Sequence, residues 1–310
     1  MAEGLFWEVL DSLGKAFPAF KTKGRKYPNL PYRFKRTITV VDSTVIPLVA
    51  NCMTWAKHRR QKAAAKTHAA LDLYSFLPKY IIVCRAKDHD SKIAWELCSD
   101  IKDGEIVLYD KAYVDFEHLH HLNKRGVFWV TRAKDNMVYD IVGQQTSSSS
   151  KIICDLCIKL NGPTTSKQYP DELRLVEAVV KINDKEEVMT FITNHLEWAP
   201  SSICDLYQSR WGIEVFFKEI KQTLQLADFM GYSENAVRWQ VWIALLVYLL
   251  LRFIAWLNKW KHSFKRIFTA IRSVIWNFFD LFSVLDCCGT AGGLSKVKAY
   301  IEQQCLPGFT

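Results

Sequence analysis

The sequence has 310 residues, 49% of them apolar, which is enough for a buried core and excludes a chain that is disordered throughout. The formal net charge is +9, and much of the basic charge lies in three stretches that hold no acidic residue, 12–41, 43–71 and 235–279. These stretches contain eight, five and seven Lys or Arg residues. Solvated surfaces usually mix both signs of charge, so this pattern favours a polyanionic partner, and nucleic acid is the usual one.

The first 135 residues are predicted to alternate strands and helices. A short amphipathic helix is expected at 5–17, followed by a basic linker at 21–36. Further along, the hydrophobic pattern predicts, in order, strands at 37–41, 69–74 and 80–84, a helix at 90–101, a strand at 105–109, a helix at 116–124 and a strand at 127–131. This order of elements predicts an α/β fold.

The second half of the chain begins with a different pattern. Residues 136–187 contain short alternating segments separated by Ser, Gly and Pro clusters, which predicts a β-rich insertion. A helical pattern returns at Pro200 and continues to about residue 226. The apolar run 241–251 is too short to cross roughly 30 Å of hydrocarbon, so we expect a helix buried behind the sheet.

The predicted helix after Pro200 has an unusual row of polar side chains. The row consists of Tyr207, Arg210, Glu214 and Lys221, whose spacing of three, four and seven residues returns to nearly the same side of a helix. The apolar side chains follow a separate side, made of Ile213, Phe216, Phe217, Ile220 and Leu224. Spacing alone leaves two readings open, a functional row or an exposed face with ion pairs.

Two acidic residues stand directly after predicted strands. Asp42 follows the run Ile-Thr-Val-Val, and Asp110 follows Ile-Val-Leu-Tyr. A lone acid in such a place is usually a turn or cap residue. Together with Glu214, however, the two acids could converge on metal ions, since two-metal cleavage of a phosphodiester needs several carboxylates. Mg²⁺ takes such hard oxygen ligands.

These residues together resemble the bacterial insertion-sequence transposases of family four, which carry a D-D-E triad and a Y-x2-R-x3-E-x6-K signature. The matching residues are Asp42 in VVDST, Asp110 in LYDKAYVDF, and Tyr207, Arg210, Glu214 and Lys221 in YQSRWGIEVFFKEIK. Further segments that resemble the family are AKTH at 65–68, FWVTRAKDN at 128–136, TFITNH at 190–195 and the segment 231–250. The resemblance covers roughly residues 33–251.

The resemblance implies a ribonuclease-H-like fold of the retroviral-integrase type, with a β-rich insertion between the second Asp and the Glu. It implies that Asp42, Asp110 and Glu214 are catalytic and bind two divalent metal ions, Mg²⁺ or Mn²⁺. Tyr207, Arg210 and Lys221 would contact the DNA backbone. The implied reaction frees the 3′ end of an element by hydrolysis and joins that 3′-OH to target DNA.

The implied partners are double-stranded DNA, at element ends and at the target, and a second copy of the chain in a synaptic complex. We expect a cytoplasmic, nucleoid-associated protein with no membrane partner. Nine scattered cysteines and a first segment unlike a secretory signal are consistent with a reducing compartment.

The expected domain organisation follows from the resemblance and the composition. Residues 1–35 would be a short helical and basic remnant of a DNA-end-binding region, 36–135 the first part of the catalytic domain and 136–190 the β-rich insertion. Residues 191–260 would complete the catalytic domain with the signature helix, and 261–310 would form a basic C-terminal segment.

Two departures from the family pattern affect these expectations. Ala112 stands where the family usually has Gly, and a left-handed conformation there would strain Ala by about 1 kcal/mol or more. Only 41 residues precede Asp42, fewer than in longer relatives, so a shortened chain is expected. A shortened, non-catalytic DNA-binding inhibitor of the full-length transposase is therefore an alternative function, and a nuclease without strand transfer is another.

Two weaker signals are interpreted as structural. His118, His120 and His121 would spread around a helix and are expected on a solvated face. Trp198 lies near the signature helix and could hold an unstacked base, but a core position is the more common role for Trp.

Overall fold

The computed structural model describes residues 1–22, 34–48, 52, 56, 63–85, 90–145, 150–182, 185–224, 229–276 and 280–288. Parts of four predicted segments lie outside these ranges: most of the basic linker at 21–36, residues 146–149 and 183–184 of the β-rich insertion, the end of the helix at 225–226, and residues 277–279 and 289–310 of the C-terminal segment.

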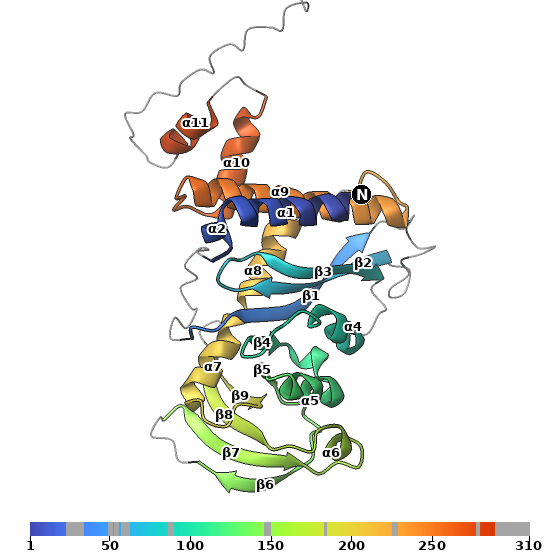
Figure 1. Ribbon diagram of the computed structural model, residues 1–310, viewed down its shortest axis with the longest axis vertical. Coiled ribbons are helices and arrows are strands. Elements are labelled where there is room, and N and C mark those ends of the chain that lie inside the picture. The colour runs from blue at the N-terminus through green and yellow to red at the C-terminus, as the bar shows by residue number, and fades with distance from the viewer. Residues whose placement is uncertain are drawn as a thin grey trace, which may run out of the picture.

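The fold is built on one nine-stranded sheet in the order β3-β2-β1-β4-β5-β9-β8-β7-β6, which runs from the top to the bottom of Figure 1. The first five strands are β1 (Ile38–Leu48), β2 (Ala63–Asp72), β3 (Pro78–Arg85), β4 (Ile106–Tyr109) and β5 (Phe128–Arg132). β1, β2 and β3 pair antiparallel, whereas β4 runs parallel to β1 and β5 parallel to β4. This arrangement confirms the predicted α/β, ribonuclease-H-like fold.

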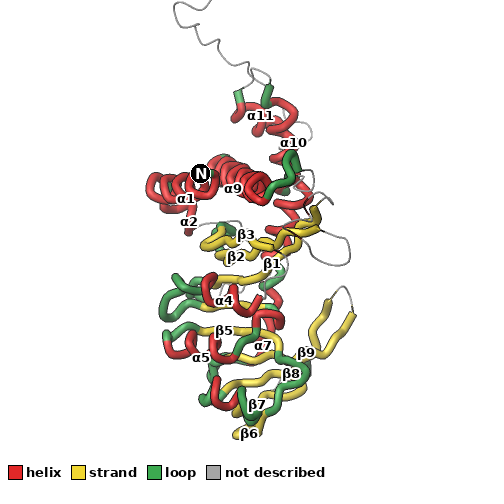
Figure 2. Tube along the Cα trace, turned by 90° about the vertical axis from the view of Figure 1, so that its right-hand side faces the viewer, coloured by secondary structure: helices red, strands yellow, loops and turns green. Residues whose placement is uncertain are grey.

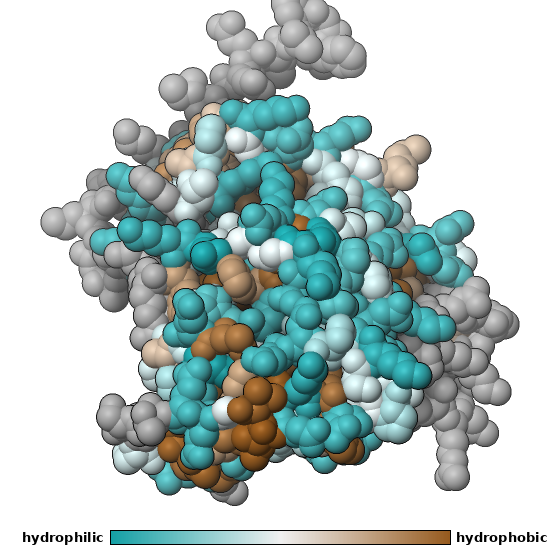
Figure 3. All heavy atoms as spheres, turned by 60° about the horizontal axis from the view of Figure 1, so that its bottom comes forward, coloured by the Kyte–Doolittle hydropathy of each residue, from teal (hydrophilic) through white to brown (hydrophobic). Residues whose placement is uncertain are grey.

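The remaining strands continue the same sheet. They are β6 (Tyr139–Gln144), β7 (Ile152–Leu160), β8 (Leu173–Ile182) and β9 (Lys185–Thr193), all joined antiparallel, and α6 (Thr165–Gln168) lies between β7 and β8. β9 pairs antiparallel with β5, so the β-rich segment extends the sheet. Its far end exposes the apolar side chains of Ile141, Val142 and Ile153, and apolar surface gathers on that end of the molecule in Figure 3.

Helices cover the two faces of the first five strands, and the alternation of side chains along each strand assigns residues to a face. Val40, Leu108 and Val130 pack in one core with helices α7 (Pro200–Ser209) and α8 (Gly212–Lys218). Val41, Val107 and Trp129 pack in the other core, with α4 (Asp90–Leu97) and α5 (Phe116–Lys124). We call these the α7–α8 face and the α4–α5 face.

The N-terminal and C-terminal helices meet beyond the β3 end of the sheet, as both views show (Figures 1 and 2). They are α1 (Ala2–Ala16), α2 (Pro18–Thr22), α9 (Glu234–Leu257), α10 (Phe264–Val274) and α11 (Leu281–Cys288). Phe6 of α1 is fully buried and its ring lies 5.6 Å from that of Trp242 in α9. Among the described helices, α9 alone is long and apolar enough to span a membrane, but Val241, Leu245 and Tyr248 are buried in the core.

Several predicted boundaries were wrong, and two of them bear on the site. The first strand does not end before Asp42, because residues 42–48 keep their pairing with β2 as far as Leu48 opposite Ala63. The helix expected from Pro200 to about residue 226 is interrupted: α7 ends at Ser209, α8 begins at Gly212, and Glu219–Thr223 forms a π-helical turn, η3. Gly212 lies against the β2–β3 turn, where a Cβ atom would come within 2.8 Å of Leu73.

Candidate active site

Asp42 lies in the middle of β1 on the α7–α8 face, two residues after the buried Val40. The backbone N–H of Ser43 donates to Asp42 Oδ1 at 2.7 Å. The carboxylate is therefore held by its own strand and points toward the helices that carry the signature residues. Only 17% of its side chain is exposed.

Asp110 directly follows β4, as the sequence predicts, and caps a short 3-10 turn, η2 (Lys111–Tyr113). Its Oδ1 accepts from the backbone N–H of Lys111 at 2.8 Å, so Asp110 does act as a cap residue, which is the usual role of a lone acid after a strand. Among the described residues other than Gly, only Phe76 and Lys259 have a positive φ. Ala112 therefore sits in a right-handed turn, and the strain considered for it does not arise.

Arg210, at the break between α7 and α8, connects two of the three predicted acids. Its Nη1 donates to Asp42 Oδ2 at 2.8 Å and its Nη2 to Glu214 Oε1 at 3.3 Å. The Arg210 side chain is 9% exposed and that of Glu214 56% exposed. Asp42 and Glu214, 172 residues apart in sequence, thus share one nearly buried guanidinium.

The electrostatics of Asp42 show that the site is short of positive charge. Burial raises the pKa of the Asp42 carboxyl to about 6, although Arg210 and the Ser43 N–H lower it. The Asp110 and Glu214 carboxylates raise the same pKa further. The Asp110 and Glu214 carboxylates are therefore close enough to oppose the ionisation of Asp42, and the Arg210 guanidinium does not fully offset burial and these two charges.

Tyr207 connects the same helix to Asp110. Its hydroxyl donates to Asp110 Oδ1 at 3.5 Å, its ring packs against Phe191 and the Arg210 guanidinium lies 5.5 Å from the ring centre. Burial raises the pKa of Tyr207 to about 12, so the hydroxyl is a donor at neutral pH. Two of the four residues in the polar row, Tyr207 and Arg210, thus contact the acids after β4 and on β1, and Glu214 is joined to Asp42 through Arg210.

Lys221 stands further along, in the π-helical turn. Its Nζ donates to the carbonyl oxygen of Val45 at 3.4 Å, three residues past Asp42 on β1. Burial lowers the pKa of the Lys221 ammonium. Lys221 therefore lies along β1 beside the carboxylates and does not contact them in the interactions described.

The chemistry of the three acids fits a divalent cation, because carboxylate oxygens are the ligands that Mg²⁺ prefers and the raised pKa of Asp42 shows a need for positive charge. As they stand, no three His, Cys, Asp or Glu side chains within the described ranges are gathered closely enough to hold an ion. Arg210 lies between Asp42 and Glu214 instead. A cation would take over contacts that the guanidinium now makes.

The α4–α5 face behind these acids carries a buried network that the sequence did not suggest. The Tyr109 hydroxyl bonds to His118 Nε2 at 3.0 Å and to Cys98 Sγ at 2.8 Å. The expectation of a solvated His118 was wrong, since its side chain is buried beneath the strand that ends at Asp110. The signal was present: His118 and Leu122 lie one turn apart on the apolar side of α5.

A second buried pair adjoins both acids. His68 Nδ1 and the Tyr113 hydroxyl are 2.8 Å apart. His68 pairs in register with Ser43, the residue after Asp42, and Tyr113 ends the turn capped by Asp110. This contact joins the surroundings of the two acids from the face opposite the signature helix.

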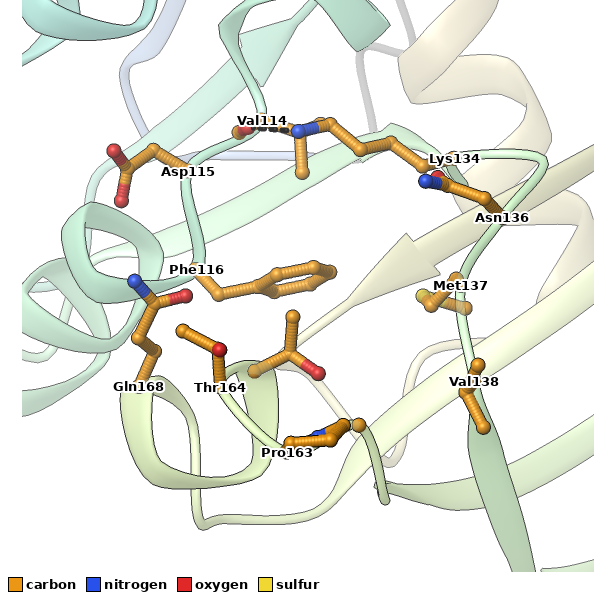
Figure 4. Close-up of a pocket in the computed structure, with 12 residues that line it drawn as sticks. Val114, Asp115, Phe116, Lys134, Asn136, Met137, Val138, Pro163, Thr164 and Gln168 are labelled. Atoms are coloured by element: carbon orange, nitrogen blue, oxygen red, sulfur yellow. Dashed lines mark hydrogen bonds between the residues drawn. The ribbon is translucent and has the colours of Figure 1, made fainter.

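A second cavity and the Trp198 side chain lie outside the group of three acids. A cavity of about 480 Å³ is lined by Phe116, Met137, Asn136 and Gln168 among others, and within it Lys134 Nζ donates to the Val114 carbonyl at 2.7 Å (Figure 4). Trp198 is partly buried and already stacks on His195, with ring centres 4.0 Å apart.

Comparison with known protein families identifies the family of this chain. A family model described as "Transposase DDE domain" matches residues 33–250 of the chain. The chain belongs to this family. The match confirms the resemblance to insertion-sequence transposases, and transposases of this family act on DNA through a domain that generally uses divalent metal ions.

Two transposases from bacteria are about 30% identical to this chain over the aligned residues. A putative transposase from Sinorhizobium fredii is 32% identical over 72% of this chain and 62% of its own length. A probable transposase for an insertion sequence element of Geobacillus stearothermophilus is 28% identical over 72% of this chain and 58% of its own. The chain thus spans about three-fifths of the length of these two transposases.

Among solved structures, the chain is similar to a piggyBac transposase in a synaptic complex with hairpin DNA. The TM-score is 0.48 and the sequence identity 11%, over 80% of this chain and 52% of that chain.

Proposed function

We propose that this transposase-family chain cuts DNA at the ends of an element and joins the freed 3′-OH to target DNA, with Asp42, Asp110 and Glu214 as its catalytic, metal-binding residues. The observation that carries the proposal is the Arg210 guanidinium, which bonds to both Asp42 and Glu214 while Tyr207 of the same helix reaches Asp110. Distant acids that share a site short of positive charge are typical of a metal-dependent centre.

The three carboxylates would hold two divalent ions, Mg²⁺ or Mn²⁺. Such ions, when bound, activate the attacking oxygen and stabilise the leaving oxygen of the phosphodiester. Asp42 and Asp110 are fixed by backbone N–H groups, whereas Glu214 is more exposed and can adjust. The rigid pair would set the site and the helical Glu would complete it.

The cationic and phenolic side chains would bind the DNA backbone. Arg210 stays charged at any physiological pH, and a guanidinium can donate two parallel hydrogen bonds to a phosphate. When ions neutralise Asp42 and Glu214, Arg210 can turn to the phosphate beside the cut. The protonated hydroxyl of Tyr207 would donate to a neighbouring phosphate. The ammonium group of Lys221, which lies along β1, would donate to another.

The assembly and location follow the same proposal. A homodimer that brings two element ends together, and association with the nucleoid, fit a protein that acts on paired DNA ends. The division into residues 1–35, 36–135, 136–190, 191–260 and 261–310 stays a prediction, although the sheet runs without interruption from the second segment into the third. The comparisons do not favour the alternative of a non-catalytic inhibitor.

The test is cleavage of a duplex that carries the inverted repeat found beside the gene. Asp42→Asn, Asp110→Asn and Glu214→Gln should each slow Mg²⁺- or Mn²⁺-dependent cleavage about a thousandfold or more, since losing several kcal/mol of charge stabilisation costs about tenfold per 1.4 kcal/mol. Binding of the duplex should be largely retained. Asp140→Asn, at an exposed carboxylate of β6, is the matched control. If any of the three variants cleaves as fast as the control, that residue is not catalytic.

A further inference from the structure

A cavity of about 210 Å³ lies beside the carboxylates, between α7 and the β8–β9 hairpin. Tyr207 and Arg210 form its wall toward the active site, and Phe191 lines it from β9. Arg132, the last residue of β5, also lines it, together with Lys181 and Glu187 of the hairpin. No residue of the β8–β9 hairpin and no residue of β5 has a role in the proposed chemistry so far.

The sheet register brings Arg132 level with the two catalytic aspartates. Val40 pairs with Leu108, and Leu108 with Val130, in neighbouring parallel strands. Two residues further along each chain stand Asp42, Asp110 and Arg132. Because side chains alternate between faces, these three point to the same α7–α8 face as Val40, Leu108 and Val130.

The row continues into the hairpin. Arg132 pairs with Phe191 of β9, and Phe191 packs against Tyr207, whose hydroxyl reaches Asp110. Arg132, Phe191 and Tyr207 thus form a chain of neighbours that leads to Asp110.

The charges of the cavity select an anion. Arg132, Lys181 and Arg210 oppose one carboxylate, that of Glu187. Arg210 is committed to Asp42 and Glu214. Within the described part of the chain, the Arg132 guanidinium takes part in no hydrogen bond or ion pair, and its side chain is only partly exposed. Lys111 lowers the pKa of the exposed Asp135 carboxyl, and the charge of Arg132 adds only a minor contribution. A half-buried guanidinium that is not hydrogen-bonded to a carboxylate, beside the proposed catalytic site, is suited to a phosphate.

We propose that this cavity is a phosphate subsite, in which Arg132, assisted by Lys181, binds the DNA backbone next to the phosphodiester at Asp110. Phe191 and Met189 would face the sugar. This inference rests on the proposed function, which supplies DNA as the ligand and places the phosphodiester at Asp110. It assigns to Arg132 and the β8–β9 hairpin the task of holding the strand in line with the carboxylates.

The experiment measures binding of a labelled DNA duplex to the full chain by fluorescence anisotropy, with a chelator present so that no cleavage occurs. Arg132→Gln should weaken binding about five- to tenfold at low salt and lower the slope of log affinity against log salt by about one, as expected for one lost phosphate contact. Arg132→Lys should keep most of the slope. Lys159→Gln, at an exposed cation of β7, is the control.

A second variant, which is expected to strengthen DNA binding, tests the same cavity. Glu187→Gln removes the carboxylate of the cavity and should tighten binding about twofold or more, since like charges near the phosphate oppose it. Glu187 is exposed, so its replacement leaves the core unchanged. Glu187→Gln therefore tests the phosphate subsite even if Arg132→Gln folds poorly.

The proposal is overturned if Arg132→Gln binds DNA with the salt slope of Lys159→Gln, or if Glu187→Gln binds no tighter than the unmodified chain. These outcomes are separate from the catalytic assignment. Loss of cleavage in Asp42→Asn with an unchanged slope in Arg132→Gln would remove the phosphate subsite and leave the proposed function standing.

Discussion

The two faces of the sheet treat buried polar groups in opposite ways. On the α7–α8 face, burial raises the pKa of the Asp42 carboxyl, the two nearby carboxylates raise it further, and the single guanidinium of Arg210 lowers it only in part. On the α4–α5 face, Tyr109, His118 and Cys98 are buried as groups that hydrogen-bond to one another through the Tyr109 hydroxyl. The first arrangement leaves charge for a ligand to complete, whereas the second only stabilises the fold.

The largest effect on stability should come from His118, on the neutral face. Burial lowers its pKa from 6.5 to about 4, so between these values the unfolded chain binds a proton that the folded chain does not. Stability from this group is present above pH 6.5 and is lost as the pH falls toward 4, by about 3 kcal/mol.

Urea unfolding at pH 7 and pH 4.5 checks this prediction, with His118→Gln as the comparison so that other titrating groups cancel. The loss on acidification should be about 2 kcal/mol larger in the unmodified chain than in the variant, since pH 4.5 lies short of the folded-state pKa. Equal losses would mean that His118 is accessible to protons in the folded state.

A smaller effect is expected from Arg210 on the charged face. Arg210→Met leaves Asp42 buried without its partner, and we expect a loss of about 1–2 kcal/mol, less than for a fully buried pair because Glu214 is exposed. Mg²⁺ should then raise the melting temperature of the variant more than that of the unmodified chain, because the ion replaces the lost charge.

Arg238→Met is the matched control, since Arg238 pairs with Glu234 one turn away at an exposed position. Its stability should change by less than about 1 kcal/mol and its response to Mg²⁺ should equal that of the unmodified chain. An Arg210→Met protein that responds to Mg²⁺ no more than this control would contradict the competition between guanidinium and metal.

The smallest effects separate two tyrosines that flank the same acid. Tyr109→Phe should cost about 1 kcal/mol of unfolding free energy, because it breaks the contacts with Cys98 and His118, and should leave cleavage unchanged. Tyr207→Phe should change stability less and slow cleavage several-fold. Unfolding curves and cleavage rates of both variants test this, and the reverse pattern would move the functional role to the α4–α5 face.

Much of the site could be predicted because it depends on local pattern. The spacing of Tyr207, Arg210 and Glu214 places them on one side of a helix whether or not that helix is interrupted, and Asp110 follows a short apolar run that ends where the strand ends. Asp42 was expected after a strand and lies inside one, because pairing with β2 is a long-range contact that no local pattern reveals.

Other features depend on contacts between distant segments. The ion pair between Arg210 and Asp42 joins residues 168 apart in sequence. Arg132 stands in the segment FWVTRAKDN, which resembles the family, but its place beside Asp110 appears only when β4 and β5 are aligned and β9 is added to the sheet. His118 is hidden in the sequence by its neighbours His120 and His121, which together suggest a polar face, although its spacing from Leu122 places it on the apolar side of α5.

The central claim is that Asp42, Asp110 and Glu214 together hold the catalytic metal. The most direct measurement is a crystal structure of the full chain with Mn²⁺, in which anomalous scattering locates the ions. The account predicts two peaks about 3.5–4 Å apart between the three carboxylates, with Arg210 turned away from Asp42. Ions held by other residues, or an Arg210–Asp42 pair that persists at Mn²⁺ concentrations supporting cleavage, would contradict it.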